Sequence, residues 1–104
     1  MPLRVYLCRV DDVVAGELRA RAVVGVTWPV LVTRLDGEIV ATAGVCPHED
    51  VGLDDGELDG GTVVCPGHGY RFDLRTGACG HDPDLRLRRY PVTVVGDAVY
   101  VDLL

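Results

Sequence analysis

Two short segments that each hold a cysteine and a histidine constrain this chain more than any other feature. The first is Cys46-Pro47-His48, and the second, which begins nineteen residues later, is Cys65-Pro66-Gly67-His68. Sixteen residues, 49–64, separate them. Two thiols and two imidazoles are a complete set of four ligands for a metal centre. The fold must therefore bring the two segments together if they act as one site.

The residues around these ligands favour tight turns. A proline follows each cysteine, restricts φ and lacks an N–H. Gly67 and Gly69 permit close backbone approach or positive φ. Each turn can therefore direct one sulfur and one nitrogen to the same side. The sequence between the turns predicts a hairpin over residues 56–64, with its turn at Asp59-Gly60-Gly61, and this hairpin would join the two turns into one clamp.

Two kinds of centre use two cysteines and two histidines. Structural zinc is held by this set in many small domains, and four ligands alone would favour zinc. In one kind of [2Fe–2S] cluster, two imidazoles replace two thiolates on one of the irons. The sixteen-residue gap and the prolines favour the cluster. A structural zinc-binding interaction module is the alternative from another functional class.

Longer motifs around the ligands resemble those of Rieske ferredoxins, which supply electrons to bacterial aromatic-ring oxygenases. The motifs are Val45-Cys46-Pro47-His48, Asp55-Gly56-Glu57-Leu58-Asp59-Gly60, Cys65-Pro66-Gly67-His68-Gly69-Tyr70-Arg71-Phe72-Asp73, Arg75-Thr76-Gly77, and the segment from Tyr90-Pro91-Val92 to Val99-Tyr100-Val101. The resemblance covers nearly the whole chain and is strongest from Ala43 to Leu103. It implies a Rieske-type [2Fe–2S] cluster in which Cys46 and Cys65 hold one iron, and His48 and His68 hold the other, solvent-facing iron.

The same resemblance implies a soluble, low-potential ferredoxin. It would carry single electrons from an NAD(P)H-dependent flavin reductase to a terminal oxygenase, as in aromatic hydrocarbon catabolism. The small subunit of assimilatory nitrite reductase resembles the chain in length and in its C-terminal segment, and is the alternative within the same fold. Those subunits often lack some of the ligands, whereas all four are present here, which favours the carrier. The sequence leaves open which oxygenase and which substrate are served.

The histidine count argues against an enzyme that activates oxygen by itself. Ring oxygenases also need a mononuclear iron held by two histidines and a carboxylate. The chain has three histidines, of which the cluster would use two, and His81 alone cannot build that second site. No Ser/His/Asp or Cys/His nucleophile set remains either. We therefore expect an electron-transfer component rather than an enzyme.

The pattern of apolar residues predicts an all-β domain. Strands are expected at 3–8, 18–24, 30–35, 38–41, 85–88, 91–95 and 98–103, with two-residue turns at Asp36-Gly37 and Gly96-Asp97 and a short helical turn at 11–14. By the resemblance, this is a Rieske iron–sulfur fold: an antiparallel β-sandwich base with an inserted two-loop cluster-binding subdomain at about residues 43–83. The length suits a single domain, 1–104.

Residues that differ from high-potential Rieske proteins predict a low reduction potential. Those proteins resemble the chain but carry an extra cysteine in each cluster turn, where this chain has Val51 and Gly67, so their disulfide cannot form here. They also direct a serine and a tyrosine hydroxyl toward sulfur, where this chain has Tyr70 and Phe72. Hydrogen bonds to sulfur favour the reduced state, so the loss of these two bonds lowers the reduction potential. We expect a potential near the low end of the Rieske range, about −150 mV. Both rings are also expected to pack the strand after the second turn.

Acidic residues dominate the charge near the ligands. The chain has sixteen acids, ten arginines, no lysine and a formal net charge of −6, which argues against nucleic-acid binding. Six acids and no base lie between the two ligand turns: Glu49, Asp50, Asp54, Asp55, Glu57 and Asp59. Two interpretations stay open. The segment is either a solvated loop or a docking face that steers the protein toward basic patches on its partners.

The chain shows no feature of an exported or membrane protein. Residues 1–10 carry charges and lack the apolar stretch of a signal peptide, and no run approaches the length of a membrane span. We expect a cytoplasmic monomer with no membrane partner. In a reducing compartment, cysteines serve metals more often than disulfides.

Five further residues are expected to have structural roles. Cys8 lies in an apolar strand and is expected in the core, whereas Cys79 is either buried or a surface thiol. A disulfide between them is not expected inside a cell. His81 is expected on the surface rather than as a ligand, and by the resemblance Pro83 belongs to a loop that covers the cluster. Trp28 is expected at a strand entry or packing corner.

Overall fold

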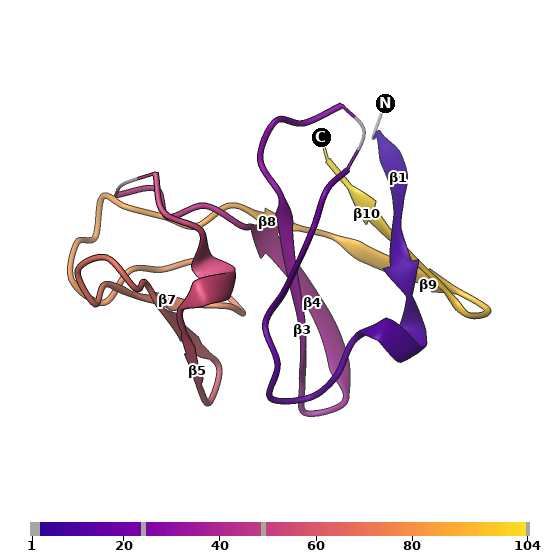
Figure 1. The fold of residues 1–104 in the computed structure, drawn as a ribbon, viewed down its shortest axis with the longest axis horizontal. Helices are drawn as coiled ribbons and strands as arrows, with labels where there is room; N and C mark the ends of the chain where they lie inside the picture. The colour runs from indigo at the N-terminus through magenta and orange to yellow at the C-terminus, as the bar shows by residue number, and fades with distance from the viewer. Residues whose placement is uncertain (1–2, 24, 49, 104) are drawn as a thin grey trace.

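The chain folds into three antiparallel β-sheets and two short 3-10 turns. The structure, a computed structural model, describes residues 3–23, 25–48 and 50–103. Within these ranges it places ten strands and no α-helix, which confirms the predicted all-β class. Figure 1 shows the two base sheets at the centre and right, with a smaller lobe on the left. In the described part of the chain, no helix is long and apolar enough to cross a membrane.

The first base sheet joins the beginning and the end of the described chain. Its order is β1 (Arg4–Arg9), β10 (Ala98–Asp102) and β9 (Val92–Val95). The turn between β9 and β10 contains Gly96 at a φ of 59°, which glycine adopts without strain. All three predicted strands are confirmed to within one residue at each end.

The second base sheet contains the hairpin with the strongest turn signal. Its order is β2 (Arg19–Arg21), β3 (Val30–Leu35), β4 (Glu38–Ala43) and β8 (Arg89–Tyr90). Asp36 and Gly37 have φ values of 51° and 81°, as a type I′ turn requires, so the predicted two-residue turn is confirmed. The strand predicted at 18–24 is shorter than expected because β2 pairs only with β3, and Arg21 already lies opposite Val30, the first residue of β3. Val24 lies outside the described residues.

The strand predicted at 85–88 is wrong. Contact with β4 begins only at the last residue of the predicted strand, where the carbonyl of Arg88 accepts the N–H of Ala43, and before it Arg86 forms one isolated bridge with Ala78. The backbone here is bonded to a turn instead, since the N–H of Leu87 donates to the carbonyl of Gly77 at 2.8 Å. An alternating sequence therefore forms a loop where its hydrogen bonds go to a turn rather than to a neighbouring strand.

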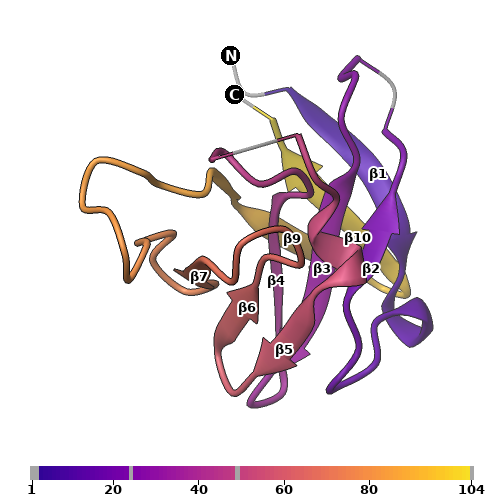
Figure 2. The same cartoon turned by 60° about the vertical axis from the view of Figure 1, so that its left-hand side comes forward.

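The third sheet forms the smaller lobe, in the foreground of Figure 2. Its order is β5 (Glu57–Asp59), β6 (Thr62–Val64) and β7 (Arg71–Asp73). β5 and β6 are the predicted hairpin, whose turn contains Gly60 at a φ of 60°. The 3-10 turn η2 (Leu53–Asp55), which precedes this sheet, was not predicted.

Strand β3 links the lobe to the base because its two faces enter different cores. Val30 and Val32 pack in the core of the base, whereas Leu31 and Leu35 pack in a second core, as the two-residue period of a strand allows. The other buried members of the second core are Val40, Cys46, Leu53, Val63, Cys65, Phe72, Leu74, Cys79 and Leu87. A shared apolar core therefore holds the lobe against the base.

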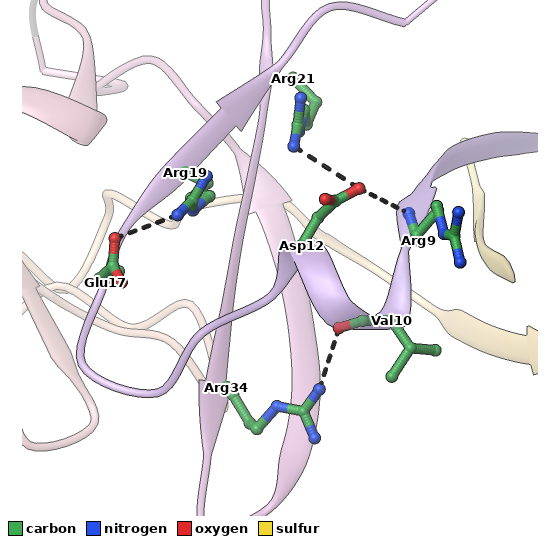
Figure 3. A network of polar contacts seen from close by, with 7 residues as sticks. All are labelled: Arg9, Val10, Asp12, Glu17, Arg19, Arg21 and Arg34. Carbon is green, nitrogen blue, oxygen red and sulfur yellow. Dashed lines mark hydrogen bonds and ion pairs between the residues drawn. The ribbon is translucent and has the colours of Figure 1, made fainter. Parts of the chain in front are cut away.

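A polar network, drawn in Figure 3, closes the corner around the first 3-10 turn, η1 (Val10–Asp12). The carboxylate of Asp12 accepts a hydrogen bond from the backbone N–H of Arg9 at 3.0 Å and lies 3.7 Å from the guanidinium of Arg21. Arg34 on β3 donates to the carbonyl of Val10 at 3.1 Å. The helical turn predicted at 11–14 is thus present as a shorter 3-10 turn at Val10–Asp12, and these contacts connect it to β2 and β3.

Candidate metal centre

The first cysteine–histidine turn is closed by backbone hydrogen bonds around a buried thiol. The N–H of Cys46 donates to the carbonyl of Val51 at 2.9 Å, and the N–H of Leu53 donates to the carbonyl of Gly44 at 2.8 Å. Cys46 is only 2% exposed, whereas His48 is exposed. The turn therefore directs its sulfur into the second core and presents its imidazole at the surface.

The second turn has the same division between sulfur and nitrogen. The N–H of Cys65 donates to the carbonyl of Tyr70 at 2.8 Å, and the N–H of Gly69 donates to the carbonyl of Cys65 at 3.0 Å. Gly69 has a φ of 76°, which supports its predicted role in the turn. Cys65 is 1% exposed, and His68 is exposed.

The fold brings the two turns together, as the hairpin predicted. The imidazoles of His48 and His68 meet edge to face, with ring centroids 5.2 Å apart and planes at 79°, and both cysteines belong to the second core. Within the described ranges, no three His, Cys, Asp or Glu side chains form a group that could hold a metal ion. The structure thus places the four residues at adjoining turns, and ligation by them remains a prediction.

A second feature of the site was not predicted: Tyr70 stacks against two histidines. Its ring centroid lies 4.1 Å from that of His48, with planes at 18°, and 5.1 Å from that of His81, with planes at 16°. His81 is exposed, as expected, and its Nδ1 accepts a hydrogen bond from the backbone N–H of Arg71 at 3.4 Å. The sequence holds no signal for these contacts, because the three residues lie on separate loops.

Phe72 and Trp28 have the packing roles that were expected of them. Phe72 is fully buried in the second core. The indole N–H of Trp28 donates to the hydroxyl of Tyr90 at 2.9 Å, so Trp28 forms a corner against β8. Pro83 is exposed in the loop that follows His81.

The two remaining cysteines lie in different cores and do not form a disulfide. Cys8 is buried in the base, as predicted. Its burial raises the pKa of the thiol; Arg21 partly offsets this effect and Asp12 adds to it. Cys79 is buried in the second core, which settles the open alternative, and its sulfur accepts the N–H of His81 at 3.4 Å. Neither thiol is a surface group.

The acidic segment between the ligand turns lies at the surface. Its exposed carboxylates are Asp50, Asp54, Asp55, Glu57 and Asp59, and Glu49 lies outside the described residues. Asp59 is in an ion pair with Arg71 at the start of β7. The acidic segment is therefore exposed, as both interpretations of it require.

Comparisons of the sequence and of the structure with known proteins point to the same family. The family model for the Rieske [2Fe-2S] domain matches residues 4–91. The ferredoxin component of a p-cumate 2,3-dioxygenase system from Pseudomonas putida is 42% identical over 102 residues, 95% of this chain and 85% of that protein. Sphingomonas yanoikuyae B1 ferredoxin has a TM-score of 0.87 at 35% identity, with 100% of each chain covered.

Two further structures bear on the alternatives. A chain from the complex of reduced oxygenase and oxidized ferredoxin in carbazole 1,9a-dioxygenase has a TM-score of 0.85 at 31% identity, with 95% of this chain and 92% of that chain covered. A proposed NADH-dependent nitrite reductase small subunit from Mycobacterium tuberculosis has a TM-score of 0.84 at 23% identity, with 100% of this chain and 97% of that chain covered, so its likeness shows the fold alone. The relatives named as ferredoxins favour the carrier, and the matched family favours the cluster over zinc.

Proposed function

The chain belongs to the Rieske [2Fe-2S] domain family, and we propose that it is a ferredoxin that delivers single electrons to a terminal oxygenase. Relatives of 42% and 35% identity are named as ferredoxin components of dioxygenase systems. The chain is an electron-transfer component rather than the enzyme that acts on the substrate. Its cofactor is a Rieske-type [2Fe–2S] cluster, which when bound accepts and releases one electron at a time.

Four residues would hold this cluster: Cys46 and Cys65 on one iron, and His48 and His68 on the other. The donor set fits, because a Rieske centre uses two thiolates and two imidazoles. The observation that carries the proposal is the division of the site, in which both cysteines are nearly inaccessible and both histidines are exposed. Buried sulfur protects the inner side of the site, and exposed imidazoles offer a partner a short path for the electron.

The chain's own residues would orient these ligands. The backbone bonds of Cys46 and Cys65 lie within the turns themselves, so they fix the backbone from which each thiol projects. The shared second core supports both turns from behind. We propose that residues 1–104 act as one domain, with a cluster-binding subdomain at about residues 43–83 that corresponds to this lobe.

The partners proposed for the chain are a flavin-dependent ferredoxin reductase as donor and a terminal oxygenase as acceptor, with the protein acting as a cytoplasmic monomer. The complex described for carbazole 1,9a-dioxygenase supports the acceptor. The exposed acids in the segment between the two ligand turns would favour basic docking patches on these partners.

The ligand assignment is tested by iron, acid-labile sulfide and EPR measurements on the purified protein and its variants. His48→Ala and His68→Ala should lose redox activity. His81→Phe is the matched control, since it removes the third histidine but keeps a ring in its place, and it should retain the cluster. Purified protein with zinc, no iron and no sulfide would contradict the proposal, and so would either ligand variant that cycles normally.

The docking face is tested by electron transfer between purified components. Added salt and the charge reversals Asp54→Arg and Asp55→Arg should slow transfer. Asp97→Arg is the control, because that carboxylate is 87% exposed on the far turn between β9 and β10. Electron-transfer rates that change with neither salt nor charge reversal would contradict the docking face and favour the interpretation of the segment as a solvated loop. Failure to couple to any oxygenase would favour the nitrite reductase alternative.

A further inference from the structure

Four rings at the site form a continuous series of contacts that begins at His68 of the second ligand turn. His68 meets His48 edge to face, His48 stacks on Tyr70 at 4.1 Å, and Tyr70 stacks on His81 at 5.1 Å. Tyr70 is half-buried, whereas His48 and His81 are exposed. The series therefore runs from one proposed iron ligand to a histidine that binds no iron.

Backbone hydrogen bonds of Tyr70 and of the next residue, Arg71, fix the position of Tyr70. Its carbonyl accepts the N–H of Cys65 at 2.8 Å, which ties it to the second ligand turn. The next residue, Arg71, donates its N–H to Nδ1 of His81 at 3.4 Å, and its carbonyl accepts the N–H of Gly80 at 2.9 Å. Tyr70 thus has a defined place relative to both loops, and its ring offers a fixed flat surface.

An imidazole at an exposed loop tip has much freedom in its second side-chain torsion, because sp³–sp² torsions have broad minima. Metal-ligating histidines therefore depend on neighbouring groups that set the plane of the ring. For His48, the stacked ring of Tyr70 is such a neighbour. His81, stacked on Tyr70 in turn, restricts the movement of Tyr70.

We propose that Tyr70 and His81 are positioning residues that set the plane of the His48 imidazole through stacking. This inference rests on the proposed function, which makes His48 an iron ligand. It assigns the role to the rings and not to the tyrosine hydroxyl, because the contacts with His48 and His81 are both between near-parallel planes. It also gives a function to His81, which takes no part in the proposed ligand set.

The test compares variants that keep a ring with variants that remove it. Tyr70→Phe and His81→Phe retain stacking, whereas Tyr70→Leu and His81→Leu abolish it. Tyr100→Leu is the control, since Tyr100 contacts only Tyr6 among aromatic rings in the described residues, on the first base sheet. EPR of the reduced protein reports the ligand field and its spread, and release of iron to a chelator reports how firmly the ligands are held.

Both leucine variants should broaden the EPR lines. His81→Leu, which loses one ring contact, should release iron about 2- to 13-fold faster, and Tyr70→Leu, which loses two, should release it faster still. The phenylalanine variants and Tyr100→Leu should match the parent. Unchanged spectra in Tyr70→Leu or His81→Leu overturn the proposal, as does a Tyr70→Phe spectrum as broad as that of Tyr70→Leu. If Tyr70→Leu does not fold, the comparison of His81→Phe with His81→Leu tests the proposal, because His81 is exposed and its replacement leaves the core intact. A parent protein without iron and sulfide would overturn the proposed function instead.

Discussion

Replacing Gly77 by alanine should destabilise the protein more than the same change at Gly96. Both glycines have positive φ, 83° and 59°, so alanine costs about 1–2 kcal/mol of unfolding free energy at either position. Their surroundings differ. A Cβ at Gly77 would lie 2.3 Å from the carbonyl oxygen of Leu87, whereas a Cβ at Gly96 would meet nothing within 4 Å.

The additional cost at Gly77 follows from this contact. The Leu87 carbonyl must retreat by about 0.7 Å before the contact reaches 3.0 Å. That movement weakens the hydrogen bond from the Leu87 N–H to the Gly77 carbonyl, now 2.8 Å, at a buried position, which adds about 1–3 kcal/mol. We expect Gly77→Ala to lower the unfolding free energy by about 2–5 kcal/mol, against about 1–2 kcal/mol for Gly96→Ala.

Unfolding rates are the appropriate measurement, since a protein with a tightly bound cluster does not unfold as a two-state system. Loss of visible absorption in denaturant, without oxygen, would give the rate for each variant. An excess of 1–3 kcal/mol corresponds to about 5- to 160-fold faster unfolding of Gly77→Ala than of Gly96→Ala, if the turn forms after the transition state. Equal rates would refute the reasoning that the Leu87 contact controls this turn.

Three further predictions follow from burial and from the site. Phe72→Ala removes a fully buried ring and should cost about 3–5 kcal/mol, seen as faster unfolding in the same assay, whereas Val95→Ala, 60% exposed, should change stability by less than about 0.5 kcal/mol. Because burial raises the pKa of Cys8, the unfolded chain loses this proton first, so stability should fall as pH rises above about 8.5; Cys8→Val should weaken that fall, and an unchanged pH profile would contradict it. Voltammetry should give a potential of about −150 mV, and a midpoint well above zero would show that the residues at positions 70 and 72, Tyr70 and Phe72, do not lower it.

The hairpins were predictable from the sequence because their signals are local. Asp36-Gly37 and Gly96 allow positive φ between apolar strands, and the structure uses each of them as a turn. The strand predicted at 85–88 was wrong because its outcome depended on distant residues. The turn that contains Gly77 takes the hydrogen bond that a neighbouring strand would have taken.

The sequence by itself predicted the cofactor, since Cys46, His48, Cys65 and His68 and the motifs around them indicated an iron–sulfur centre, and the matched Rieske family model supports that cofactor. Only the tertiary structure decided that Tyr70 meets both His48 and His81. A ligand motif is a property of neighbouring residues, and turn chemistry limits it to few conformations. Ring contacts between separate loops depend on how those loops pack on the second core, and no local pattern in a chain encodes that packing.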